Sequence, residues 1–282
     1  MTHPVTRPVA HPVTVRLAVL GLGEAGSLIA RDLVAAGADV VGYDPAVPEL
    51  AGVPTVGSEA LAVQGRPLVL AVTPAADAAT ALGNASAALA SGQLYADLST
   101  GSDTLKRALA ASCAVTGAAF VDVALMSPVP GNGLRTPMFA SGGGAGQFAV
   151  QLAGLGATVD VVGDEPGEAA RRKLLRSVFY KGWAAAVVEA LDAAERAGLR
   201  EWLADNIAGE LERSDRGTLE RLVNGSVRHA RRRVHEMEAA AEVVRDLGVT
   251  PHVADAARRV LEGLRDRPAV SGSPAGSPRS GR

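Results

Sequence analysis

Three glycines near the start of the chain are spaced as in loops that hold phosphate groups. Gly21, Gly23 and Gly26 follow the apolar run 15–20 and open a stretch of helix-forming residues, 25–36. Such glycines allow a tight turn, a close approach of phosphate to the backbone, and close packing of helix on strand. The helix N-terminus adds N–H groups and the positive end of its dipole. This context predicts a dinucleotide pyrophosphate site formed by Gly21, Leu22, Gly23, Glu24, Ala25 and Gly26.

An acidic residue follows the next apolar run, 40–43. Asp44 lies 18 residues after Gly26, where a carboxylate can accept hydrogen bonds from the hydroxyls of the adenine ribose. A carboxylate there also repels a 2′-phosphate, and the neighbouring Pro45 and Ala46 supply no cation to bind one. We therefore expect NAD as the cofactor in preference to NADP.

Hydroxyl side chains stand at the ends of two further apolar runs. Thr73 and Pro74 follow one run, and Ser99, Thr100 and Gly101 follow the other. Ligands of open parallel sheets bind at the carboxyl ends of the strands. We expect the first pair to border the nicotinamide ribose and the second group to hold a substrate carboxylate. Alternatively, one of the two hydroxyl residues of the second group caps the helix that follows.

Two lysines lie on a helix predicted from Pro166 to Gly198. Lys173, Ser177 and Lys181 are spaced i, i+4, i+8 and so share one helical face. Reduction of a carbonyl by hydride leaves an alkoxide that needs a proton, and the reverse reaction needs a base; a lysine in a dry cleft serves both. Either lysine can fill this role, with Ser177 placing the substrate. The alternative is that all three are solvated helix residues.

The most charged segment of the chain, 228–238, contains a further candidate. Arg232 can bind an anionic substrate through both arms of its guanidinium group. In the alternative, it pairs with Glu236 one turn away on an exposed helix face. His229 and His235 have no companions at metal-ligand spacing, and we expect no metal.

Apolar runs alternate with helix-like stretches through the first half of the chain, which predicts a doubly wound parallel sheet with helices on both faces. Residues 1–165 carry 7 basic and 13 acidic side chains, whereas residues 166–282 carry 21 and 17. We predict a Rossmann domain over 14–165 and an all-helical domain over 166–267, beginning with the long helix. The segments 1–13 and 268–282 are rich in proline and are predicted to be disordered.

The overall composition limits the classes of partner. The net charge of −2 gives no argument for binding nucleic acid or a membrane, and no uncharged apolar stretch is long enough to span a bilayer. Cys113 is the only cysteine, which excludes a disulfide within the chain and suits a reducing compartment. We expect a cytoplasmic protein whose partner is a small, anionic substrate.

Several of these segments resemble the β-hydroxyacid dehydrogenase superfamily, which includes 6-phosphogluconate and 3-hydroxyisobutyrate dehydrogenases. The opening 19–33, the segment Asp97-Leu98-Ser99-Thr100-Gly101 and the strand 120–124 occur in the order of that family, and Lys173 matches its catalytic lysine. The resemblance implies hydride transfer between a nicotinamide cofactor and a small hydroxy or oxo acid, with Lys173 as general acid and base. It also implies a homodimer. The helical part resembles a poorly characterised branch with a phosphogluconate-dehydrogenase-like C-terminal domain.

The chain departs from the family on the substrate side. On that side, residues 126–137 replace a glycine-rich loop and Ser177 stands where asparagine is usual. In the cofactor-binding opening of the chain, Ala25 stands where methionine is usual. Two alternatives therefore stay open. One is an imine reductase, a class with the same architecture that lacks the lysine; the other is a nicotinamide-binding regulatory module without turnover.

Overall fold

The computed structural model describes residues 14–265, so the disorder predicted for 1–13 and 268–282 falls outside the described residues. The chain divides into two compact units after Arg176. The division lies inside helix α6, Glu168–Arg196. The domain limits predicted from composition, with a boundary at 165, stay a prediction.

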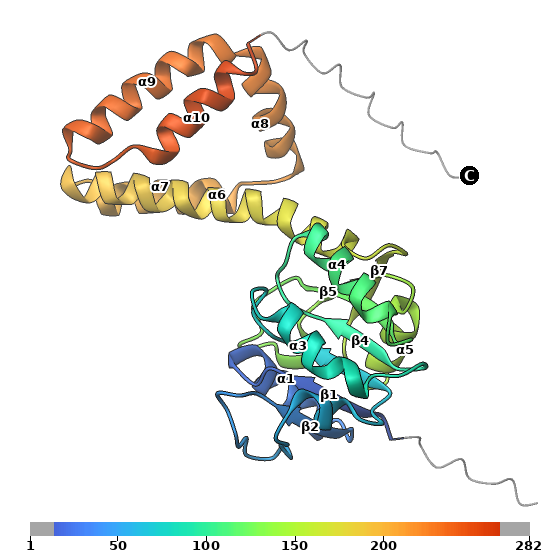
Figure 1. Ribbon diagram of the computed structural model, residues 1–282. Helices are drawn as coiled ribbons and strands as arrows, with labels where there is room; N and C mark the ends of the chain where they lie inside the picture. Colours follow the sequence, from blue (N-terminus) through green and yellow to red (C-terminus); the bar gives the residue numbers. More distant parts are fainter. Residues whose placement is uncertain (1–13, 266–282) are drawn as a thin grey trace, which may run out of the picture. The chain divides into compact units, whose positions relative to one another are not determined.

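A seven-stranded sheet forms the centre of the first unit (Figure 1). Its strands, in chain order, are β1 Arg16–Leu20, β2 Asp39–Tyr43, β3 Leu68–Ala71, β4 Leu94–Asp97, β5 Ala119–Leu125, β6 Met138–Ser141 and β7 Val159–Gly163. They lie in the order β2-β1-β3-β4-β5-β6-β7. From β1 the chain turns outward to β2 and then returns to the other side of β1 with β3, which creates a switch point where ligands of such sheets bind. The predicted Rossmann fold class is confirmed.

The sheet is not parallel throughout. Strands β1 to β5 pair in parallel, but β6 runs antiparallel to β5, with Asp122 opposite Ser141. The link between them contains only the 3-10 turn η2, Gly133–Arg135, rather than a full crossover helix. A chain that returns without a crossover helix pairs antiparallel. Strand β7 follows helix α5 and is again parallel to its neighbour β6.

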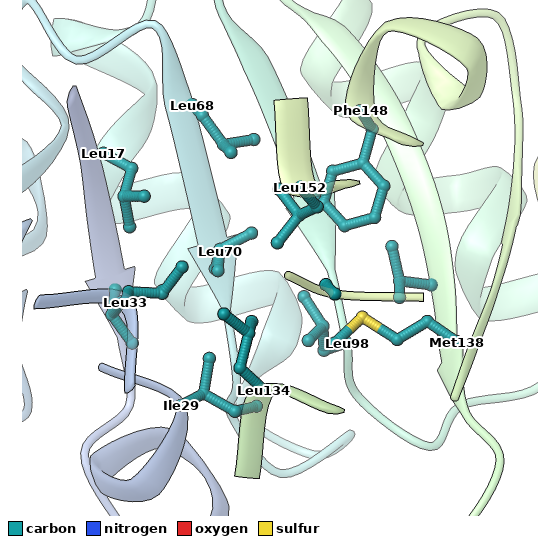
Figure 2. Packing of buried hydrophobic residues seen from close by; sticks show 14 of the residues in the cluster. Leu17, Ile29, Leu33, Leu68, Leu70, Leu98, Leu134, Met138, Phe148 and Leu152 are labelled. Atoms are coloured by element: carbon teal, nitrogen blue, oxygen red, sulfur yellow. The ribbon is translucent and has the colours of Figure 1, made fainter. Parts of the chain in front are cut away.

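Helices cover both faces of the sheet. On one face lie α1, Glu24–Ala35, and α5, Ala145–Ala153; the core beneath them includes Leu70 and Phe148 (Figure 2). On the other face lie α2, Glu59–Val63, α3, Ala78–Ala85, the 3-10 turn η1, Ser86–Ala88, and α4, Asp103–Ala114. Burial on both faces explains why the strands are continuous apolar runs. Helix α2 is too short to show a helical period in the sequence.

The second unit is helical, as predicted. Beyond the last turns of α6 it contains α7 Arg200–Glu212, α8 Arg216–Arg228, α9 Ala230–Asp246 and α10 His252–Glu262. Helices α9 and α10 pack side by side (Figure 1). The Glu189 carboxylate of α6 accepts hydrogen bonds from the N–H groups of Val253 and Ala254 at 2.7 and 3.0 Å. Of the helices between residues 14 and 265, none is long and apolar enough to cross a membrane.

Candidate active site

The glycine-rich loop joins β1 to α1, and its three glycines have different surroundings. Gly21 has a φ of +90°, and a Cβ there would lie 2.5 Å from the Val72 carbonyl oxygen. A Cβ on Gly26 would collide with the Gly21 carbonyl. Beside Gly23, in contrast, the described residues place no atom within 4 Å of the Cβ position, apart from Gly23 itself and its two chain neighbours. The fold itself therefore requires Gly21 and Gly26, whereas Gly23 leaves open space for a phosphate group.

The start of α1 is also arranged to receive an anion. Its N-cap is Gly23, and no side chain of the described residues caps this end of the helix. Asp44, at the end of β2, holds the loop: its Oδ2 accepts the Leu22 N–H at 2.7 Å and its Oδ1 accepts the Ala46 N–H at 2.8 Å. Each carboxylate oxygen has a second acceptor site for a ribose hydroxyl. The loop, the helix end and Asp44 together fit a dinucleotide.

Two buried hydroxyl groups at this edge of the sheet have no hydrogen-bond partner among the described residues. They are the Oγ1 of Thr73, just after β3, and the Oγ of Ser127, just after β5. Buried polar groups are nearly always hydrogen-bonded in proteins, so these two fit a bound ligand. Thr73 was among the predicted residues and Ser127 was not. The position of Ser127 just after a predicted strand was the feature of the sequence that could have identified it.

The loop after β4 presents only one of its two hydroxyls. Ser99 is buried and donates to Asp97, with its Oγ 3.1 Å from Oδ2 and its backbone N 2.7 Å from Oδ1. Thr100 is exposed, and its Oγ1 accepts a hydrogen bond from Lys173 Nζ at 2.9 Å. The structure thus brings together two of the predicted site residues.

The remainder of this loop leads into α4. A Cβ on Gly101 would lie 2.7 Å from Leu105 Cδ2, so a larger residue here requires the Leu105 side chain to shift. The alternative role of Ser99 or Thr100 as helix cap is wrong, because the side chain of Ser102 caps α4 by accepting the Leu105 N–H at 3.1 Å.

The first turn of α6 is held against the sheet. Asp122 Oδ2 accepts the N–H groups of Gly167 at 3.1 Å and Ala170 at 2.9 Å. The Ser141 hydroxyl accepts the Ala169 N–H at 3.0 Å. These bonds satisfy N–H groups that every helix start leaves unpaired. They fix the turn immediately before Lys173.

Two arginines on the same turns add further anchors. Arg171 donates to Asp103 of α4 at 2.7 Å, and this hydrogen bond lowers the pKa of the Asp103 carboxyl. Arg176 donates to the Met126 carbonyl oxygen at 2.9 Å, in the loop after β5. The beginning of α6 is therefore attached on both sides of Lys173, and the position of that lysine next to Thr100 is well defined.

A third lysine, which was not among the predicted site residues, lies beneath the site. Lys106 of α4 is fully buried. Its Nζ lies 3.2 Å from Asp122 Oδ1 and 3.5 Å from Asp97 Oδ1, and it donates to the Asp97 carbonyl oxygen at 2.8 Å. The sequence did offer a reason to consider Lys106, because the chain has only three lysines against 25 arginines.

The other predicted residues belong to the second unit. Ser177 is half-buried and Lys181 is exposed. Arg232 forms an ion pair with Glu236, as its alternative interpretation expected, with Nε and Oε1 3.4 Å apart. Their contact with a substrate stays a prediction. Within residues 14–265, no three histidine, cysteine or acidic side chains are grouped to hold a metal ion.

Two segments of the chain match known family models. Residues 16–143 match the NAD-binding domain of 6-phosphogluconate dehydrogenase. This match covers the sheet from β1 to β6. Residues 194–264 match a domain of unknown function, DUF1932. The predicted resemblance to the dehydrogenase superfamily and to a poorly characterised branch is confirmed.

Solved structures agree with the family matches. A conserved protein of unknown function, described as structurally similar to 3-hydroxyacid dehydrogenases, is 28% identical, with 89% of this chain and 97% of that chain covered and a TM-score of 0.59. An imine reductase from Streptomyces aurantiacus is 22% identical, with coverage of 88% and 93% and a TM-score of 0.73. A reductive aminase from Aspergillus terreus, in complex with NADPH and ethyl levulinate, is 18% identical, with coverage of 89% and 93% and a TM-score of 0.73. Among proteins with curated descriptions, none matches.

The open space beside Gly23 leads to a prediction. Because its φ is −63° and nothing crowds its Cβ position, Gly23→Ala should fold with unchanged thermal stability. The added methyl group occupies the place of a phosphate, and a clash of about 1–3 kcal/mol lowers NADH affinity roughly 10- to 100-fold by calorimetric titration. Gly57→Ala, at another uncrowded glycine, is the control and should bind NADH normally. Normal binding by Gly23→Ala would contradict the assignment of the loop.

Proposed function

We propose that this chain is a nicotinamide-dependent oxidoreductase that acts on a small hydroxy or oxo acid in the cytoplasm. The observation that carries the proposal is the 2.9 Å hydrogen bond between Lys173 Nζ and Thr100 Oγ1, at the same edge of the sheet as the glycine-rich loop. An amine and a hydroxyl in contact at that edge can bind a hydroxyl or carbonyl oxygen and exchange a proton with it.

Each residue has a distinct part in this proposal. Gly23 and the start of α1 hold the pyrophosphate, Asp44 holds the adenine ribose, and Thr73 and Pro74 border the nicotinamide ribose. A bound nicotinamide supplies or accepts the hydride. Lys173 Nζ gives a proton to the substrate oxygen during reduction and takes one during oxidation. Thr100 directs the amine by accepting one of its hydrogens.

We also propose that the protein binds NAD in preference to NADP. Asp44 places a carboxylate beside the ribose position, and residues 44–50 include no lysine or arginine. Arg16 and Arg66 pair with Asp39 at the beginning of β2, whereas Asp44 follows the end of that strand. The reductive aminase that contains NADPH shares the fold, but its 18% identity does not carry a cofactor preference to this chain.

Titration of the purified protein with NADH and NADPH tests this preference. The wild-type protein should bind NADH more tightly, and Asp44→Asn should narrow the difference, because the repulsion of the 2′-phosphate is removed. Asp39→Asn, at the opposite end of the same strand, is the matched control and should leave the ratio unchanged. Tighter NADPH binding by the wild-type protein would overturn the preference and leave the fold assignment intact.

An imine reductase is the second candidate. The similarity in fold to imine reductases favours it, with a TM-score of 0.73 for the Streptomyces enzyme. Lys173 favours the hydroxy-acid reaction instead, because protonating an alkoxide requires an acid at that position. The regulatory-module alternative predicts cofactor binding without hydride transfer to any member of a broad substrate panel.

Substitution of the two lysines separates these functions. Lys173→Met should slow turnover of a hydroxy acid by about 10²–10⁴-fold, the usual contribution of a general acid or base, while NADH affinity stays unchanged. Lys181→Met, two turns further along α6, is the matched control and should retain turnover. The reverse pattern would assign the role to Lys181. Imine reduction that survives Lys173→Met would favour the imine reductase.

We further propose that the chain acts as a homodimer through its second unit. Large apolar side chains of that unit are exposed, among them Trp202 at 63%, Leu219 at 60% and Leu222 at 56%. Exposed apolar side chains in such number are typical of an interface. Sedimentation equilibrium should give twice the chain mass, and Leu219→Glu with Leu222→Glu should give one chain mass. A monomeric wild-type protein would contradict this proposal.

A further inference from the structure

A buried group of charges lies under the proposed site and has no part in the chemistry described so far. Asp97 and Asp122 are register partners on the neighbouring parallel strands β4 and β5. Such strands lie about 4.8 Å apart, so the two carboxylates share one face of the sheet at close range. Both are fully buried, as is Lys106, which lies within ion-pair distance of each.

The cation is needed because two carboxylates this close repel each other strongly in a medium of low dielectric constant. Burying each ion carries a further desolvation cost of several kcal/mol, which only good pairing and additional hydrogen bonds offset. Lys106 supplies the pairing. The hydrogen bonds come from the Ser99 N–H and hydroxyl on Asp97, and from the start of α6 on Asp122.

Both carboxylates therefore hold segments that lead to the proposed site. Asp97 binds Ser99, the residue immediately before Thr100. Asp122 binds the Gly167 and Ala170 N–H groups, one turn before Lys173. Thr100 and Lys173 are the two groups that meet at 2.9 Å. The buried Lys106 ammonium group thus contacts both the carboxylate that holds the Thr100 loop and the carboxylate that holds the start of α6.

We propose that Lys106 is a positioning residue for Lys173. By holding Asp97 and Asp122 at a fixed separation, its ammonium group sets the distance between the Thr100 loop and the first turns of α6. The expected effect of Lys106 on turnover rests on the proposed function, in which Lys173 exchanges a proton with the substrate. The effect of Lys106 on the position and reactivity of the Lys173 amine does not depend on which reaction the protein catalyses.

Competitive acylation of the lysines, followed by mass spectrometry across a pH series, tests this effect directly. The chain has three lysines, and Lys106 is fully buried, so Lys173 is read against Lys181 in the same molecule. In Lys106→Met, the cluster loses its cation. The pH profile for labelling of Lys173 should move to higher pH. Loss of the Lys106 cation leaves the cluster more negative, which favours the ammonium form of Lys173. The profile of Lys181 should not move.

A second variant keeps the test decisive if Lys106→Met does not fold, since an unpaired buried charge strongly destabilises a protein. Lys106→Met combined with Asp122→Asn keeps the net charge of the cluster, and the asparagine oxygen can still accept the α6 N–H groups. We expect this double variant to fold and to label Lys173 at an altered rate. In Arg31→Met, which removes an exposed cation on helix α1, Lys173 should be labelled at the wild-type rate.

Turnover provides the second measurement. A displacement of the reacting amine by about 1 Å costs on the order of 100-fold in rate, so kcat of the folded double variant should fall by tenfold or more with unchanged NADH affinity. A folded double variant with wild-type labelling of Lys173 and wild-type kcat would overturn the proposal. If the wild-type protein turns over no substrate, the proposed function fails, whereas the labelling result still decides the role of Lys106.

Discussion

The attachment of the α6 N-terminus to Asp122 is the interaction on which the proposed site depends. Two backbone N–H groups of the first turn donate to one buried carboxylate oxygen at 2.9 and 3.1 Å. Hydrogen bonds to a charged group are each worth about 1.5–3 kcal/mol, and the positive end of the helix dipole adds to them. Because a helix is rigid over its first turns, this attachment also determines where Lys173 lies.

The edge of the sheet has two parts with different requirements. Around β1 and β2, the site is largely backbone: the glycines, the uncapped start of α1 and the Asp44 carboxylate receive a dinucleotide without a precisely placed side-chain amine. Around β4 and β5, side chains must meet within hydrogen-bonding distance, as Lys173 and Thr100 do. The buried charges lie under the second part, where accurate placement matters.

The sequence predicts the first part well and the second part incompletely. The strand–glycine–helix–acid order is local, so the fold class and the Asp44 position follow from it. Ser99 shows the limit: its type and place after a strand suggested a ligand contact, but its hydroxyl donates to Asp97. The antiparallel β6 and the burial of Lys106 depend on long-range pairing, which no local pattern encodes. A lysine on an amphipathic helix is normally expected at the surface.

The central claim is that one edge of the sheet holds both a nicotinamide cofactor and a reactive lysine. Acylation of Lys173 with and without saturating NADH tests this most directly, with Lys181 as the reference in the same chain. NADH should slow the labelling of Lys173 and leave that of Lys181 unchanged. Equal labelling of Lys173 in both conditions, with NADH binding demonstrated by calorimetry, would place the cofactor away from this lysine and contradict the account.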